Sequence, residues 1–312
     1  MRIILSYNGK EHGILYPPLT LLSLANILYE HGYDVELVQD DEYYDYTGLP
    51  GDSPSQREYL YLAEKIQLLT GYKASIFNEK VNYELCPDFD VPLVITSYGC
   101  QFSCTDCTKL EKGQIYRRPF KTVLEELKWI TDRYDYFEFG DYNIFLDKNN
   151  FFKIIEYIPK GVKWGALINI DNNYSEQDLK YIYEKGCVNI YTGIESFNPK
   201  DLEYFKKPYY LKGIDPKEFL LKLKGIGFNI NVYLIRGLPN QTRAEWIETT
   251  DWLKSHGISY TSNTFYDPVT NTFIEETAHL SKEYLTVKRD EDYNQTNKNL
   301  LKFLEPYMPC RL

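Results

Sequence analysis

The sequence predicts an α/β fold, in which a partial parallel (β/α)6 barrel follows a small N-terminal βαβ unit and precedes a C-terminal helical tail. The chain has 312 residues, 43% of them hydrophobic, so it can bury a large core without disulfides. Between residues 91 and 266, six short apolar runs alternate with segments of helical spacing. This alternation is typical of a parallel sheet with right-handed crossovers. We therefore divide the chain into a shortened Rossmann-like domain (1–90), the barrel (91–266) and a helical extension (267–312).

The N-terminal unit is predicted from two strands and one helix. Residues 2–6 and 34–38 have the apolar character of strands, and residues 17–31 have helical spacing. Proline at the start of this helix and Gly32 just after its end are both favourable at those positions. A strand, a helix and a second strand in this order form a βαβ unit. A further helix is predicted at residues 56–69.

The barrel elements follow in order along the chain. Strands are predicted where apolar and aromatic residues form short runs, at 91–97, 134–139, 163–170, 188–194, 229–235 and 258–265. Helices are predicted where apolar residues recur every three or four positions, at 123–131, 151–158, 176–185, 216–224 and 243–256. Functional residues of such barrels lie at the carboxyl ends of the strands. The tail contains apolar residues that indicate a closing helix before Pro306.

The composition excludes several classes of protein. A net charge of -10 argues against broad nucleic-acid binding through phosphate contacts. A mean hydropathy of -0.45 and the lack of a long apolar run leave no segment that spans a membrane. The first apolar run, Ile3 to Leu5, is too short for the core of a signal peptide, so we expect a cytoplasmic protein.

Three of the six cysteines lie within one loop, as Cys100-x3-Cys104-x2-Cys107. Clustered thiols in a reducing compartment are more typical of metal or redox sites than of disulfides. Structural zinc needs four ligands, and the fourth would have to come from Cys86 or a scattered histidine. Three thiolates suit a [4Fe-4S] cluster whose fourth iron stays open to bind a small molecule. A non-catalytic iron-sulfur or zinc-binding protein remains the alternative.

The loop resembles the Cys-x3-Cys-x2-Cys motif of the radical S-adenosylmethionine (radical SAM) superfamily. This resemblance implies that Cys100, Cys104 and Cys107 hold the cluster and that the open iron chelates the methionine part of SAM. It also implies reductive cleavage of SAM to a 5'-deoxyadenosyl radical, with an electron donor such as a flavodoxin. The family usually has an aromatic residue before the third cysteine. Asp106 stands there instead, which puts the adenine contact in doubt.

Further residues of the resemblance lie at predicted strand ends. Gly140 and Asp141 partly match a family motif that holds the SAM amino group, and an aspartate-capped turn is the alternative. Glu195 and Ser196 belong to a Gly-Ile-Glu-Ser sequence similar to the family's, and are candidates for the ribose or methionyl contacts. Arg236 precedes a Gly-Leu-Pro turn and is a candidate for the SAM carboxylate. The alternative for Arg236 is an ion pair with Glu195 inside the barrel.

Three other sites carry open alternatives. The pair Arg117-Arg118 either faces SAM or an anionic substrate, or forms a solvated entrance to the helix that starts at Pro119. Cys187 heads an apolar strand and is predicted to be a core residue. Cys310 is either a free thiol without a role or a group that reaches the active site.

The N-terminal unit has Tyr16-Pro17-Pro18-Leu19 at the start of its helix and Gly32-Tyr33-Asp34-Val35-Glu36 after it. In this order it resembles the start of the cobalamin-binding domain that precedes the barrel in one radical SAM subfamily. Residues 39–89 are too few for a complete domain of that kind, and the chain has no Asp-x-His-x-x-Gly motif to supply an axial histidine. The sequence therefore favours a shortened domain without cobalamin and leaves cobalamin binding as the alternative.

The predicted activity is hydrogen abstraction from a small-molecule or peptide substrate. The reaction would be an isomerisation, a lyase reaction or a transfer that forms a carbon bond. The alternative is a cobalamin-dependent methyltransferase, which the N-terminal resemblance implies.

Overall fold

The computed structural model describes residues 2–7, 10–11, 14–15, 19–39, 64–73, 79–86, 89–105, 107, 113–171, 173–238, 240–267 and 272–273. The predicted tail helix, Asp106 and Cys310 lie outside these residues.

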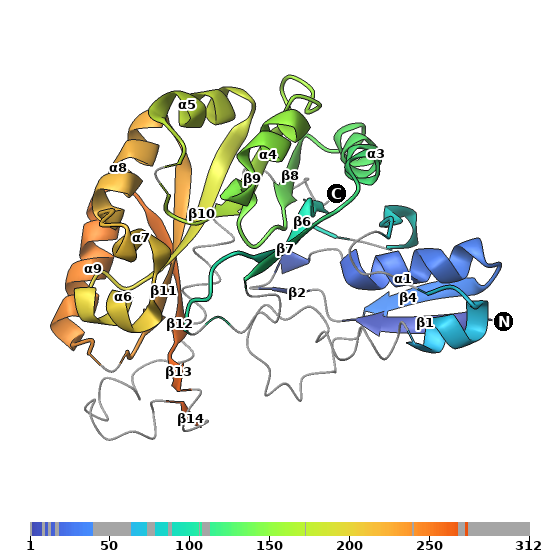
Figure 1. Ribbon diagram of the computed structural model, residues 1–312, viewed down its shortest axis with the longest axis horizontal. Coiled ribbons are helices and arrows are strands. Elements are labelled where there is room, and N and C mark those ends of the chain that lie inside the picture. The colour runs from blue at the N-terminus through green and yellow to red at the C-terminus, as the bar shows by residue number, and fades with distance from the viewer. Residues whose placement is uncertain are drawn as a thin grey trace.

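A six-stranded parallel sheet forms the centre of the molecule, in the order β12-β11-β10-β9-β8-β5. Neighbours in the sheet are also successive barrel strands along the chain, which is the arrangement of a βα barrel. The strands are β5 (Leu93–Val94), β8 (Tyr136–Phe139), β9 (Lys163–Ile168), β10 (Cys187–Glu195), β11 (Asn229–Arg236) and β12 (Ser259–Thr264). The sheet is curved but open between β5 and β12, and the predicted fold class, a partial parallel barrel, is confirmed (Figure 1).

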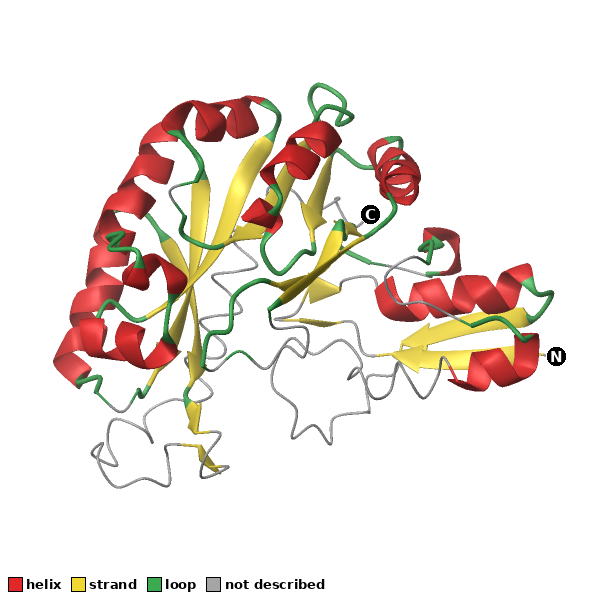
Figure 2. Ribbon diagram, in the orientation of Figure 1, coloured by secondary structure: helices red, strands yellow, loops and turns green. Residues whose placement is uncertain are grey.

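Helices cover the outer side of this sheet (Figures 1 and 2). The five predicted helices are α3 (Phe120–Thr131), α4 (Lys148–Ile155), α5 (Glu176–Glu184), α8 (Pro216–Ile226) and α9 (Arg243–Ser255). Local signals fix their ends: Ser175 and Thr242 form capping boxes at the starts of α5 and α9, and Gly227 ends α8 with a left-handed backbone. Two short helices, α6 (Pro199–Phe205) and α7 (Pro208–Leu211), were not predicted.

The two faces of the sheet differ in polarity. Side chains alternate along each strand, and residues paired in register share a face. The outer face packs against the helices with apolar residues such as Phe137, Phe139 and Trp164, all nearly inaccessible. Cys187 also lies in this core, as predicted.

We call the opposite side of the sheet the inner face. The register places polar side chains there, at Tyr136, Glu138, Asn189, Tyr191, Asn231 and Thr261. All six are buried although none is aliphatic. A buried polar face of this kind indicates a surface built for binding rather than for core packing.

The N-terminal βαβ unit is confirmed, because β1 (Arg2–Tyr7) and β4 (Asp34–Gln39) pair in parallel around α1 (Leu19–Glu30). Two short strands, β2 (Lys10–Glu11) and β3 (Ile14–Leu15), pair with each other. Residues 64–70 are helical, as the sequence predicted for part of that segment. Whether this unit is a domain of its own stays a prediction.

Residues 79–86 join the N-terminal unit to the barrel. Asn82 donates a hydrogen bond to Asn26 of α1 (3.1 Å), and Tyr83, in a 3-10 turn (Tyr83–Leu85), donates one to the carbonyl of Leu93 in β5 (2.5 Å). These contacts hold the joining segment against both parts of the chain.

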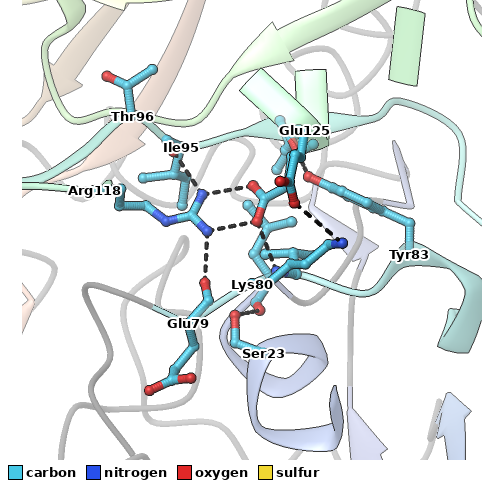
Figure 3. Close-up of polar contacts among 12 residues, drawn as sticks. Ser23, Glu79, Lys80, Tyr83, Ile95, Thr96, Arg118 and Glu125 are labelled. Carbon is cyan, nitrogen blue, oxygen red and sulfur yellow. Dashed lines mark hydrogen bonds and ion pairs between the residues drawn. The ribbon is translucent and has the colours of Figure 1, made fainter. Parts of the chain in front are cut away.

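Arg118 is the centre of this junction (Figure 3). Its guanidinium forms a bidentate ion pair with Glu126 of α3, at 2.7 and 2.6 Å, and both side chains are almost fully buried. It also donates to the carbonyls of Ile95 (2.8 Å) and Glu79 (2.7 Å). The solvated helix entrance considered for this arginine pair is wrong for Arg118, which is buried against Glu126, whereas the side chain of Arg117 is 58% exposed.

Two hairpins complete the described structure. The first pairs β6 (Ser97–Cys100) with β7 (Gln114–Arg117), and the second pairs β13 (Tyr266–Asp267) with β14 (Thr272–Phe273). A 3-10 turn (Ile144–Leu146) precedes α4. None of the helices in the described part of the chain has the length and apolar character needed to cross a bilayer.

Candidate functional site

The cysteine loop projects from the β6–β7 hairpin, directly after β5. Cys100 is the last residue of β6 and pairs with Gln114, while its carbonyl accepts a hydrogen bond from Gly113 N (2.7 Å). Cys104 and Cys107 follow in the loop, where Cys107 N donates to the carbonyl of Cys104 (3.3 Å). All three side chains are half-buried, and none of them is part of a disulfide in the described residues. The hairpin holds the first ligand rigidly and leaves the other two on an irregular segment.

A second element holds the loop from the other side. Thr105 N donates to the carbonyl of Phe205, the last residue of α6 (3.1 Å). The chain then turns through Lys206, which has a left-handed backbone with φ of 52°. This turn brings Lys207 toward the thiols.

The pKa values of the Cys100 and Cys104 thiols depend on burial and on Lys207. Burial raises the pKa of both Cys100 and Cys104, and the neighbouring thiols raise it further. The Lys207 ammonium acts in the opposite direction on both pKa values, because a nearby cation favours the thiolate. Lys207 therefore lies close enough to assist ionisation of the ligand cysteines.

Lys207 also pairs with Glu195, one of the residues singled out from the sequence. The Nζ to Oε1 distance is 2.5 Å, and the two side chains are 13% and 18% exposed. Glu195 ends β10 with a left-handed backbone, at φ of 67°, which is unusual for a residue with a side chain. Gly193 leaves room for the Glu195 carboxylate, because a Cβ at residue 193 would lie only 2.6 Å from Glu195 Oε1. The glycine and the strained glutamate together place a carboxylate beside the cysteine loop.

Asp141 lies just behind the loop, at the end of β8. Its buried carboxylate accepts hydrogen bonds from the backbone N–H and hydroxyl of Thr96 (2.8 and 2.7 Å) and of Ser97 (2.7 Å each). Burial raises its pKa, and these bonds act against that effect. Asp141 thus fixes the chain that leads into the loop. Gly140 beside it leaves room for Ile95, whose Cγ1 would be 3.1 Å from a Cβ.

The last two candidates are buried in local structure. Ser196 donates to Asp201 (2.8 Å) and accepts from Asn198 N (3.0 Å), which orders the start of α6. Arg236 is 6% exposed, and strand alternation puts it on the same side of β11 as Leu234, toward the helices. The ion-pair partner of Glu195 in the structure is Lys207, whereas the sequence had suggested Arg236 as an alternative partner. SAM contacts of Gly140, Asp141, Glu195, Ser196 and Arg236 stay predictions.

The site therefore gathers the cysteine loop, Glu195 and Lys207. Sequence reasoning missed Lys207, because no spacing or motif that we recognised separates it from the other lysines of the chain. The loop offers three soft thiolate donors, which suit an iron-sulfur cluster with one open iron. Within the described residues, no group of three histidine, cysteine or acidic side chains lies close enough together to bind a single metal ion. A cluster differs from a single ion, since each of its thiolates binds a different iron.

The fold and this loop define a class, the barrel proteins that carry an iron-sulfur cluster at the carboxyl ends of parallel strands. The sequence matches the family model of the radical SAM superfamily over residues 94–278, more than half of the chain. The protein belongs to the radical SAM superfamily. A [4Fe-4S] cluster and SAM are the groups that this family implies, so the match favours the cluster over a zinc loop.

Several known proteins are similar to this chain. An uncharacterized methyltransferase of Pyrococcus horikoshii is 30% identical over 207 residues, which are 62% of this chain and 43% of that protein. The chain therefore spans less than half of this curated relative.

Two solved structures share the fold at low identity. The radical SAM methyltransferase TsrM of Kitasatospora setae, with tryptophan and a SAM analogue bound, aligns with a TM-score of 0.57 at 13% identity, over 84% of this chain and 72% of its own. The cobalamin-dependent SAM radical enzyme OxsB, with aqua-cobalamin and SAM bound, aligns with a TM-score of 0.54 at 13% identity, over 98% of this chain and 56% of its own.

Proposed function

We propose that this protein is a radical SAM methyltransferase that acts on a small molecule or peptide. The observation that carries the proposal is the cysteine loop, held beside the Glu195–Lys207 pair at the carboxyl ends of the barrel strands. Membership of the superfamily supports the use of SAM. The name of the Pyrococcus relative and the activity of TsrM support methyl transfer.

The residues of the chain have distinct tasks in this proposal. Cys100, Cys104 and Cys107 hold the cluster, which when bound supplies an open iron for SAM and the electron that cleaves it. Lys207 favours ionised thiols and presents an ammonium to the methionyl carboxylate of SAM. Glu195, fixed by its left-handed backbone, presents a carboxylate to the amino or ribose groups. A flavodoxin-type protein is the proposed electron donor.

Cobalamin is part of the proposal as a carrier of the methyl group. The expectation that this chain lacks cobalamin is not supported, since OxsB, solved with aqua-cobalamin, aligns with 98% of it. The βαβ unit of β1, α1 and β4 is the part of this chain proposed to bind it. The isomerase and lyase reactions have only superfamily membership in their favour.

The experiment is an anaerobic reconstitution of the full chain with iron, sulfide and hydroxocobalamin. We expect about four irons per chain and stoichiometric cobalt, with S-adenosylhomocysteine formed from SAM in the presence of reductant. The Cys104→Ala variant should lose the cluster and all SAM turnover. Cys86→Ala is the matched control, because Cys86 is a half-buried thiol outside the loop.

Different outcomes separate the parts of the proposal. Unchanged iron content in Cys104→Ala would refute the cluster assignment. Full iron with no cobalt, and 5'-deoxyadenosine as the main product of SAM, would refute the cobalamin methyltransferase and favour hydrogen abstraction alone.

A further inference from the structure

The strand β10 ends in a strained turn at Glu195. Its register with β11 shifts between Gly193 and Glu195, so β10 carries one extra residue, Ile194, at this point. Ser196 N donates to the carbonyl of Ile194 (2.8 Å), which closes a γ-turn around Glu195. With φ of 67° at its central residue, this is the rarer and more strained form of the γ-turn. Such a backbone persists only where surrounding contacts hold it.

Tyr209 of α7 supplies one of these contacts. Its hydroxyl donates to the carbonyl of Ile194 (3.0 Å), which is the same oxygen that closes the γ-turn. A carbonyl oxygen has two lone pairs and can accept both bonds. Tyr209 is 2% exposed, so the bond is shielded from water. The tyrosine therefore fixes the peptide group immediately before Glu195.

The pKa of Tyr209 shows that the hydroxyl lies near the site. Burial raises this pKa well above its ordinary value, and the neighbouring Glu195 and Cys104 raise it further. Tyr209 therefore keeps its proton at neutral pH and remains a hydrogen-bond donor to the turn.

The chain on both sides of Tyr209 contacts the cysteine loop. Before it, the carbonyl of Phe205 accepts the hydrogen bond from Thr105 N of the loop (3.1 Å). After it, the Lys212 ammonium lies 5.9 Å from the centre of the ring of Phe102, another residue of the loop. Because both ends of this short segment are held, Tyr209 is a fixed donor rather than a mobile one.

The direction of the Glu195 carboxylate depends on this backbone. In a regular strand the side chains only alternate between two faces, whereas an extra residue and a positive φ redirect the side chain. Here the Glu195 carboxylate meets the Lys207 ammonium at 2.5 Å, and the same ammonium lies 3.5 Å from the carbonyl of Gly193. Lys207 and Tyr209, two residues apart in the chain, thus hold the two sides of the turn.

We propose that Tyr209 is a positioning residue for SAM binding, because its hydroxyl holds the γ-turn that aims the Glu195 carboxylate. The proposal rests on the proposed function, since it concerns the SAM contact assigned there to Glu195. Tyr209 acts through Glu195 and has no direct contact with SAM in this proposal.

The test measures binding of intact SAM to the reconstituted holoprotein without reductant, by anaerobic equilibrium dialysis. Tyr209→Phe removes the hydroxyl and keeps the ring. We expect its Kd for SAM to rise about three- to tenfold, which is the effect of one lost buried hydrogen bond. Tyr210→Phe is the matched control, because it removes the same group from the next, half-buried residue of α7. Its Kd should change by less than about twofold.

A double-variant cycle separates positioning from a general loss of structure. Glu195→Ala should weaken SAM binding, and adding Tyr209→Phe should then weaken it little further, because the group that Tyr209 positions is already gone. Equal SAM affinity of the wild type and Tyr209→Phe, or fully additive losses in the double variant, would overturn the proposal. Unchanged SAM binding by Glu195→Ala would overturn it too, even if Tyr209→Phe fails to fold.

Iron content and S-adenosylhomocysteine formation are measured on the same samples, and Kd values are compared at equal iron content. Wild-type protein that binds SAM but forms no S-adenosylhomocysteine with reductant would refute the proposed function and leave the comparison of the variants intact. Wild-type protein that binds no SAM would refute both.

Discussion

Arg118→Leu is a direct test of how the barrel holds the segment in front of it. The substitution removes two bonds to Glu126 and the bonds to the carbonyls of Ile95 and Glu79 (Figure 3). It leaves the Glu126 carboxylate buried, with a hydrogen bond from Val81 N (2.7 Å) as compensation. A buried carboxylate without a countercharge is the main source of the expected loss.

The magnitude follows from this geometry. Removing one partner of a buried ion pair costs about 3–5 kcal/mol. For a chain of 312 residues that corresponds to a fall in Tm of about 5–8 °C. The adjacent Arg117 is the matched control, since it pairs with Asp147 but its side chain is 58% exposed. An exposed pair contributes about 0–1 kcal/mol, so Arg117→Leu should shift the Tm by about 2 °C or less.

The assay is thermal unfolding of the cluster-free protein, followed by far-UV circular dichroism. A double variant, Arg118→Leu with Glu126→Leu, should recover part of the loss, because it removes the orphaned charge as well. The reasoning is wrong if Arg118→Leu costs no more than Arg117→Leu, or if the double variant is less stable than Arg118→Leu.

Three further predictions concern the site and the inner face. Gly165→Ala should destabilise the protein by about 1–3 kcal/mol, because a Cβ there would clash with the side chains of Tyr136 and Tyr191. Gly225→Ala, in an open helical position, should instead stabilise it by about 0.5–1 kcal/mol, and equal effects of the two substitutions in urea unfolding would contradict this. In cluster-free protein at neutral pH, Lys207→Met should slow alkylation of Cys104 by iodoacetamide, since loss of the ammonium raises the pKa of that thiol; an unchanged rate would exclude the electrostatic contact. Asp141→Asn should cost about 1–3 kcal/mol and lower iron retention after reconstitution, because an amide nitrogen replaces one acceptor oxygen; full iron retention would show that the loop does not need this anchor.

Elements with a clear period were predictable from the sequence, while elements defined by tertiary contacts were not. Long amphipathic helices such as α9 and apolar strands such as β11 carry enough residues to show their spacing. The β6–β7 hairpin was missed, since its strands have four residues each and no alternation of apolar and polar positions. The helix α6 was missed for the same reason of length, although Pro199 and Asn198 are favourable at its start.

Individual side-chain roles were the hardest to predict. Arg118 and Arg117 are adjacent in the sequence, yet one is buried and the other exposed. The difference depends on Glu126 and on the carbonyl of Glu79, and only folding brings those groups to the same side chain. Lys207 was missed similarly, because its place beside the thiols depends on the turn after α6.

The cysteine loop is positioned by three separate elements, and this has a consequence for assembly of the cluster. Asp141 at the end of β8 binds the residues before the loop, the β6–β7 hairpin holds Cys100, and α6 binds Thr105. Each contact uses backbone groups or a buried carboxylate, none of which belongs to the cluster itself. The anchors therefore exist before iron binds, so the protein loses less conformational entropy when the cluster forms. Because the anchors come from elements far apart in the sequence, the loop can bind its cluster only after the barrel has folded around it.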